Sequence, residues 1–154
     1  MNAAPPSGAR VLIAEDHRNT AALLSRLLSV AGFHPASASE PSVITDVVLH
    51  EDVAVVLASY SGRGIAATTD LVGALRSRPE PELSEVGVVA LVDDEADARF
   101  GLAAAADAVL VRPVDVTALA DALTDVAATH ASMRAARRAA GETIDRAAGA
   151  TTRP

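Results

Sequence analysis

The sequence predicts an α/β fold, a doubly wound parallel sheet of five strands with helices on both faces. Five short apolar runs alternate with helical patterns along the 154 residues, which is typical of repeated strand–helix–strand units. Half of the residues are hydrophobic but only 2% are aromatic, so Ala, Val, Leu and Ile must build the core. Because crossovers between parallel strands are right-handed, the helices then cover both sides of one sheet.

Short apolar runs mark the strands. We expect them at residues 10–14, 33–38, 53–57, 86–92 and 108–111. Runs without polar alternation are typical of strands that helices cover on both faces. The second run contains Pro35, which has no amide hydrogen to donate to a neighbouring strand, so this strand is expected at an edge of the sheet.

Helical spacing of apolar residues fills the intervals between these strands. We expect helices from Thr20 to Gly32, from the N-cap Ser39 through Leu49, over 67–76, over 95–105, and from near Asp115 onward. The connection through Pro79 and Pro81 is expected to be irregular, since each proline interrupts helical hydrogen bonding.

The last helix carries an apolar pattern longer than the domain needs. Its members alternate in spacing between three and four residues, as in a helix that packs along one seam. They are Leu119, Leu123, Val126, His130 and Met133, with Ala140 and Ile144 as a continuation. The pattern predicts that this helix extends past the end of the domain.

Charge divides the chain into an acidic body and a basic tail. Residues 1–129 contain 8 Arg and 18 acids, a net charge of −10, whereas residues 130–154 contain 5 Arg and 2 acids, a net charge of +3. We expect a disordered segment at 1–9, one domain at 10–128, and a basic helical extension at 129–154 that is disordered from Gly149. The overall charge of −7 argues against general nucleic-acid binding, which depends on neutralising phosphates.

Composition also excludes several chemistries. The chain has no Cys and no Lys, so it has no disulfide, no thiolate metal site, no Schiff-base lysine and no Walker-type lysine. Its four histidines show no catalytic spacing, and we expect no enzymatic activity. No signal peptide and no apolar run of membrane-spanning length is present, which predicts a cytoplasmic protein without membrane partners.

Ligands of doubly wound sheets bind outside the carboxyl ends of the strands, so candidate functional residues are sought there. The four places are Glu15-Asp16, Ala58-Ser59, Val92-Asp93 and Arg112-Pro113. They bring acids and one cation to a common edge.

Residues 10–128 resemble the receiver domains of response regulators, the CheY-like family. The resemblance rests on Val11-Leu12-Ile13-Ala14-Glu15-Asp16, on the run from Gly101 to Arg112-Pro113, and on the order of the predicted units. It implies a flavodoxin-like sheet of strand order 2-1-3-4-5. It also implies phosphoryl transfer from a histidine kinase to an aspartate at the end of the third strand, with magnesium held by that aspartate and the acidic pair.

The chain departs from this pattern at most of the implied site. Ala58 falls at the phosphoacceptor position and its neighbour Ser59 is not a carboxylate either. The hydroxyl, aromatic and lysine positions of the family fall on Val92, Val109 and Arg112. Glu15 and Asp16 alone survive, and two carboxylates would hold magnesium only weakly. We expect Arg112 to pair with these two acids.

The leading interpretation is therefore a pseudo-receiver that signals by protein contacts without aspartyl phosphorylation. Its partner is expected to be a kinase or a regulator of a signalling pathway. The family's contact surface, the fourth helix, fifth strand and last helix, would here include Val109, Leu119, Leu123 and Val126. Two alternatives remain: a dimerisation or scaffold subunit that uses the extended last helix, and a small-molecule binder that uses the vacated pocket beside Ala58 and Val92.

Overall fold

The computed structural model describes residues 8–60, 64–99 and 105–151 and contains one sheet of five parallel strands. Their order across the sheet is β2-β1-β3-β4-β5, which confirms the predicted fold class. The strands are β1 (Arg10–Ala14), β2 (His34–Ala38), β3 (Val55–Ala58), β4 (Val88–Val92) and β5 (Ala108–Val111). As expected from Pro35, β2 lies at an edge.

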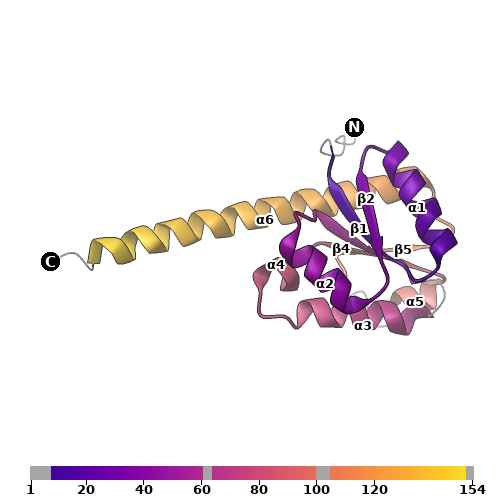
Figure 1. Cartoon of the computed structure of the whole chain (residues 1–154), viewed down its shortest axis with the longest axis horizontal. Coiled ribbons are helices and arrows are strands. Elements are labelled where there is room, and N and C mark those ends of the chain that lie inside the picture. Colours follow the sequence, from indigo (N-terminus) through magenta and orange to yellow (C-terminus); the bar gives the residue numbers. More distant parts are fainter. Residues whose placement is uncertain (1–7, 61–63, 100–104, 152–154) are drawn as a thin grey trace.

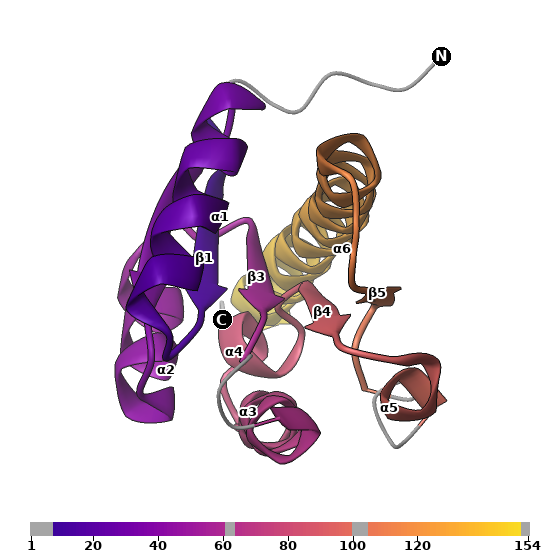
Figure 2. The ribbon, with the colours of Figure 1, turned by 90° about the vertical axis from the view of Figure 1, so that its right-hand side faces the viewer.

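Helices cover both faces of the sheet (Figures 1 and 2). They are α1 (Arg18–Val30), α2 (Pro41–His50), α3 (Gly64–Arg76), α4 (Pro81–Ser84), α5 (Glu95–Arg99) and α6 (Val116–Thr151). Side chains of α1 and α6 pack on one face, and those of α2, α3 and α4 pack on the other. The predicted helix over 95–105 is described only to Arg99, because residues 100–104 lie outside the described part of the chain.

The core consists of two apolar layers separated by the sheet. Val56 and Ala58 of β3 point into one layer, whereas Val55 and Leu57 point into the other. All residues of β3 and β4 are buried. This alternation confirms that the central strands are apolar because both of their faces are covered.

Two local features differ from the sequence prediction. The connection after α3 contains the one-turn helix α4, which begins at Pro81 and buries Leu83 completely. A single turn is too short to show helical periodicity, whereas a proline in the first turn is compatible with helix. The N-cap of α2 is Glu40 and not Ser39, and its side chain makes no capping hydrogen bond.

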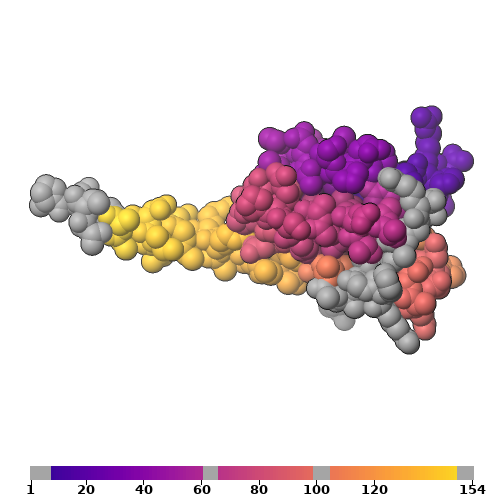
Figure 3. Space-filling model, turned by 90° about the horizontal axis from the view of Figure 1, so that it is seen from below, coloured from indigo at the N-terminus to yellow at the C-terminus, as the bar shows by residue number. Residues whose placement is uncertain are grey.

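Helix α6 has 36 residues and runs well past the sheet (Figures 1 and 3). Its first part packs on the sheet, and its remainder projects from the body of the molecule. The helix continues to Thr151, beyond Gly149, where the sequence predicted disorder to begin. The disordered segment predicted at 1–9 falls mostly on residues 1–7, which lie outside the described residues, as do 152–154.

A polar network ties α6 to the amino edge of the sheet. Asp107, which precedes β5, accepts hydrogen bonds from the Val88 amide (2.8 Å) and from Arg76 Nη2 (3.0 Å) through Oδ2. Its Oδ1 lies 3.0 Å from Nε2 of the buried His130 on α6. Arg76 also donates to the carbonyl oxygens of Ser84, Val86 and Ala105. The position of the long helix is thus set by polar bonds as well as by apolar packing.

Candidate functional site

Four polar residues gather at the carboxyl edge of the sheet because each directly follows a strand. They are Glu15 after β1, Ser59 after β3, Asp93 after β4 and Arg112 after β5. Parallel strands end at the same edge, so residues distant in sequence meet there. The sequence prediction of a polar cluster at this edge agrees with this arrangement.

Ser59 lies at the centre of the cluster. The register pairs Ala14 with Ala58, so the next residues, Glu15 and Ser59, are also neighbours. The Ser59 amide donates to the Ala14 carbonyl (2.9 Å), and its hydroxyl donates to Oε2 of Glu15 (3.2 Å). Ser59 is fully buried. Its side chain therefore has a fixed partner, Glu15, directly after β1 and no contact with solvent.

Arg112 approaches Ser59 from the other side. Its Nη2 donates to Oγ of Ser59 at 2.5 Å and lies 3.4 Å from the Ser59 carbonyl oxygen. Its Nη1 forms an ion pair with Oδ1 of Asp93 at 2.9 Å. The planar guanidinium can donate to Ser59 and Asp93 at the same time because its N–H groups point in fixed, different directions. The peptide bond from Arg112 to Pro113 is cis.

The geometry corrects two sequence-based assignments. Ala58 packs in the core with Leu12 and Ala14, so the residue beside the acidic pair is Ser59 and not Ala58. Among the described residues, the ion pair of Arg112 is with Asp93 rather than with Glu15 or Asp16. The predicted proximity of Arg112 to the acids is thus indirect and passes through the Ser59 hydroxyl.

The site residues do not fit a magnesium ion. Both carboxylate oxygens of Glu15 accept hydrogen bonds, Oε1 from the His17 amide (3.0 Å) and Oε2 from Ser59. Within the described ranges, no three residues of the metal-binding types His, Cys, Asp and Glu come together. The guanidinium of Arg112 adds a positive charge within reach of Ser59. A divalent ion that requires several oxygen ligands in octahedral geometry would find too few here.

The cavity around Val92 and Arg112 is small. Residues around Val92 and Arg112 enclose a cavity of about 10 Å³, lined also by Tyr60, Thr68 and Asp93 among others. Such a volume holds no more than a water molecule. Val92 itself is buried at the end of β4 and offers no hydroxyl. This cavity beside Val92 therefore provides no room for the small ligand considered in the sequence analysis.

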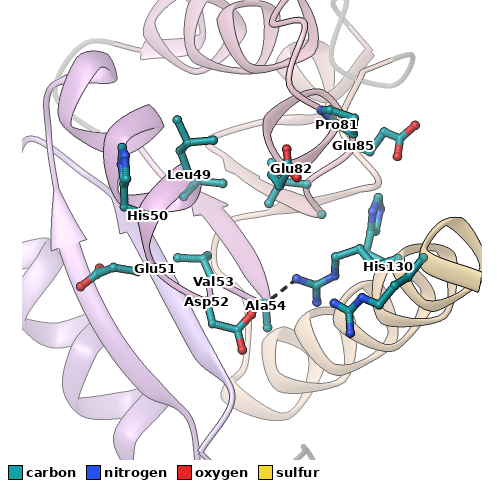
Figure 4. Close-up of a pocket in the computed structure, with 15 residues that line it drawn as sticks. Leu49, His50, Glu51, Asp52, Val53, Ala54, Pro81, Glu82, Glu85 and His130 are labelled. Atoms are coloured by element: carbon teal, nitrogen blue, oxygen red, sulfur yellow. Dashed lines mark ion pairs between the residues drawn. The ribbon is translucent and has the colours of Figure 1, made fainter. Parts of the chain in front are cut away.

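A larger hollow of about 300 Å³ lies at the junction of the α2–β3 loop, α4 and α6 (Figure 4). The sequence analysis did not anticipate it. Its lining combines Glu82 and Glu85 of α4 and the segment after it with Arg134 and Arg138 of α6. Arg134 Nη1 lies 3.7 Å from Oδ1 of Asp52 across the hollow. Acidic and basic groups are mixed along its walls, so it selects no single class of charged ligand.

The predicted contact residues of the last helix are mostly inside the protein. Leu119, Leu123 and Val126 pack against the sheet in the core and cannot form an interaction surface. The apolar spacing that suggested a surface seam instead reflects burial within the chain's own domain. Val109 on β5 is half-buried and packs against the opposite layer of the core.

Asp93 is a residue that sequence reasoning placed at the edge without giving it a role. Its carboxylate forms an ion pair with Nη1 of Arg112, while Nη2 of the same guanidinium donates to Ser59. The signal for such a role was the occurrence of an acid and an arginine directly after adjacent strands. Their pairing depends on the strand order, which only the folded sheet establishes.

Comparison with known proteins identifies the fold. No protein-family model and no curated protein matches the sequence. Among solved structures, a sensor protein from Polaromonas sp. JS666 is 19% identical with a TM-score of 0.67, covering 79% of this chain and 98% of that one. A CheY-like response regulator receiver domain from Methylobacillus flagellatus is 20% identical with a TM-score of 0.65, covering 78% and 99%.

A third similar structure contains a magnesium ion. The receiver domain of a sensor histidine kinase from Pseudomonas aeruginosa is 15% identical with a TM-score of 0.62, covering 79% of this chain and 98% of that one. It was solved with a magnesium ion in its active-site cleft. At these identities the likeness establishes the fold alone: the chain has the receiver-domain fold.

Proposed function

We propose that this chain is a receiver-fold module of two-component-type signal transduction that acts through protein contacts, without aspartyl phosphorylation and without catalysis. The observation that carries the proposal is Ser59. It is buried between Glu15 and Arg112, where a phosphorylated receiver needs a carboxylate. The receiver-domain fold supports the signalling role.

Phosphoryl transfer needs a nucleophilic oxygen, a metal ion and a cation that are held together. Ser59 is uncharged, its single proton is donated to Glu15, and Arg112 donates to its oxygen. Among the described residues, no group of three His, Cys, Asp or Glu side chains that could hold a metal ion is present. These bonds stabilise one arrangement of the carboxyl edge in the absence of any phosphoryl group.

The partner we propose is a kinase or a regulator of a signalling pathway, bound at the face formed by α5, β5 and the first part of α6. This face is proposed by analogy with the fold and not from the buried residues Leu119, Leu123 and Val126. No helix in the described residues is both long and apolar enough to cross a membrane. The cytoplasmic location expected from the sequence stays a prediction.

The experiment that tests the proposal is incubation of the full chain with acetyl phosphate and Mg²⁺, followed by intact-mass spectrometry. We expect no phosphoryl adduct, because the described carboxyl edge lacks both the acceptor carboxylate and a third metal ligand. The Ser59→Asp variant is the matched comparison, since it supplies a carboxylate at the same position. A stoichiometric adduct on the unmodified chain would refute the proposal.

A further inference from the structure

Helix α6 changes the way in which it is held to the domain at His130. Before this residue, apolar side chains such as Val126 are buried against the sheet. After it, the side chains that reach the domain at the same helical spacing are Arg134 and Arg137. We call residues 131–138 of α6 the strap. Apolar packing thus gives way to charged contacts along one face of a single helix.

Acids of the domain hold the strap in place. Arg134 Nη1 lies 3.7 Å from Oδ1 of Asp52 in the α2–β3 loop, the ion pair marked in Figure 4. Arg137 Nη2 pairs with Oε2 of Glu85, which lies between α4 and β4. The four side chains are between 37% and 100% exposed. Water and dissolved salt therefore reach both ion pairs.

The charges of the strap are unfavourable for a helix that has no acids beside it. Arg134 precedes Arg137 by three residues and Arg138 by four, and like charges at these spacings destabilise a helix. Gly141 follows, where a Cβ would meet no atom within 4 Å, so close packing does not require this glycine. Glycine inside a helix is less favourable than alanine. The acids of the domain therefore stabilise a helical segment that is weak by itself.

His130 is the fixed end from which the strap extends. The residue is buried, and its Nε2 lies 3.0 Å from Oδ1 of Asp107. Asp107 is fixed in turn, because its Oδ2 accepts from the Val88 amide and from Arg76. A Cβ added at Gly87 would lie 3.1 Å from Cδ2 of His130, so the ring also packs closely on the domain. The strap can therefore leave the domain while α6 up to His130 stays in place.

The strap forms one wall of the hollow of about 300 Å³ between the α2–β3 loop, α4 and α6. Arg134 and Arg138 line the hollow from the strap. Val53 and Val86 line it from the domain, and these two side chains are 3% and 7% exposed. Departure of the strap would open the hollow on this side and give solvent access to Val53.

We propose that the strap is a closure of this hollow that responds to ionic strength. At low ionic strength Arg134 and Arg137 hold it on Asp52 and Glu85. At high ionic strength it leaves the domain and loses helical structure, while the rest of the fold persists.

Screening supplies the physical reason for this response. The Debye length falls from about 10 Å in 0.1 M salt to about 3 Å in 1 M salt, which weakens exposed ion pairs most. Segments with few buried apolar contacts open locally without global unfolding, and a short helix without packing is marginal in water. The strap does not involve the carboxyl edge of the sheet, so its failure and that of the proposed function are separately observable.

The first test is amide hydrogen exchange of the full chain, measured in about 0.1 M and about 1 M NaCl. We expect the amides of residues 131–142 to exchange at least about threefold faster in the higher salt. The amides of residues 119–130 are the internal reference and should exchange at the same rate in both. Equal exchange of residues 131–142 at the two salt concentrations would overturn the proposal. A parallel increase in both segments would also overturn it, because the strap would then not open separately.

Glu85→Gln removes the acid that pairs with Arg137. We expect faster exchange of the strap already in the lower salt, and a smaller further increase in the higher salt. Glu82→Gln is the matched control, because Glu82 lines the same hollow but forms no ion pair with the strap in the described part of the chain. The charge-swapped double variant Glu85→Arg with Arg137→Glu should recover slow exchange. Equal effects of Glu82→Gln and Glu85→Gln would overturn the proposal.

The second test measures access to the hollow and uses the absence of cysteine from the natural chain. Val53→Cys places a single thiol at the buried lining of the hollow. Its reaction with an uncharged maleimide should be at least about threefold faster in 1 M than in 0.1 M NaCl. Val89→Cys, buried in the layer under the first part of α6, is the control and should react slowly in both. Equal rates for Val53→Cys at the two salt concentrations would show that the strap does not close the hollow.

Discussion

Arg112, which follows β5, contacts Ser59 after β3 and Asp93 after β4, and through Ser59 it is linked to Glu15 after β1. Its Nη2 lies 2.5 Å from Oγ of Ser59 and its Nη1 lies 2.9 Å from Oδ1 of Asp93, while Ser59 donates to Glu15. Hydrogen bonds thus connect the ends of β5, β4, β3 and β1 across the carboxyl edge. Because every bond is made within the chain, this edge is ordered without a ligand.

Replacing Arg112 by Ala should lower the free energy of unfolding by about 1–2 kcal/mol. The buried Ser59 oxygen loses a charge-assisted hydrogen bond, and such bonds contribute roughly this much. Urea unfolding of the two proteins measures the difference. Asp93→Asn is the control and should cost less than about 1 kcal/mol, because Asp93 is more than half exposed and exposed ion pairs contribute little. Equal losses of unfolding free energy in Arg112→Ala and Asp93→Asn would show that the hydrogen bond from Arg112 to Ser59 does not contribute to stability.

Replacing Ser59 by Asp should create a dependence of stability on Mg²⁺. The variant places a third carboxylate beside Glu15 and Asp16, where the unmodified chain has a hydroxyl. Without metal, repulsion among the three acids lowers the melting temperature. With Mg²⁺ bound only to the folded state, the melting temperature rises with metal concentration. Thermal unfolding with and without Mg²⁺ measures both effects.

The neutral variant Ser59→Asn is the matched control for this experiment. It has nearly the same size as the Asp variant but provides no carboxylate, so Mg²⁺ should leave its melting temperature unchanged. The unmodified chain should behave in the same way. A response of Ser59→Asn equal to that of Ser59→Asp would place the metal elsewhere.

Replacing Asp107 by Ala should be more damaging than any change at the carboxyl edge. The carboxylate accepts from the Val88 amide and Arg76 and also contacts His130, so its removal leaves a buried amide and a partly buried cation without their acceptor. We expect a loss of about 2–4 kcal/mol in the free energy of unfolding. Asp107→Asn keeps one acceptor oxygen and should lose less. Denaturant unfolding that ranks Asp107→Asn as the worse variant would contradict this account.

Glu80 gives a prediction for pH. Hydrogen bonds from Arg78 Nε (3.0 Å) and Nη2 (3.1 Å) hold the pKa of the Glu80 carboxyl below its usual value. The charged form is the one stabilised, so the contribution is present above the ordinary carboxyl pKa and disappears as the pH falls through the lowered value. NMR titration of the side-chain carboxyl should show a higher pKa in Arg78→Ala. Ser77→Ala, which removes a neighbouring hydroxyl, should not change it.

The sequence predicted the sheet well because its strands are apolar on both faces. Val55, Val56 and Leu57 are buried whichever way each one points, so their run identifies a central strand without knowledge of its partners. Because every residue of such a run is apolar, the sequence does not indicate which face of the sheet each side chain points to. Whether Ala58 or Ser59 faces the acidic pair depends on pairing with β1, and small residues fit either side of a strand end.

Burial of the last helix was misjudged for a related reason. The spacing of Leu119, Leu123 and Val126 is the same for a helix on its own sheet and for a helix on a partner. Which case applies depends on how far the sheet extends along the helix. Here the apolar positions up to His130 are buried on the sheet, whereas Met133 is exposed. The bond from His130 to Asp107 could not be predicted, because it joins residues 23 positions apart through the packing of α6 on β4 and β5.

The close approach of α6 to β4 leads to a final prediction, at Gly87. A Cβ added at this position would lie 2.7 Å from Val126 Cγ1 and 3.1 Å from His130 Cδ2, both on α6. Gly87→Ala should therefore push α6 outward and lower the free energy of unfolding by about 1–3 kcal/mol, as overpacked cores do. Gly73→Ala is the matched control, because a Cβ there meets no atom within 4 Å and alanine favours helix, so it should stabilise α3. Adding Val126→Ala to Gly87→Ala removes the closer contact and should cost less than the sum of the two single changes. Additive losses in this double-mutant cycle, measured by urea unfolding, would show that Gly87 does not set the distance between α6 and the sheet.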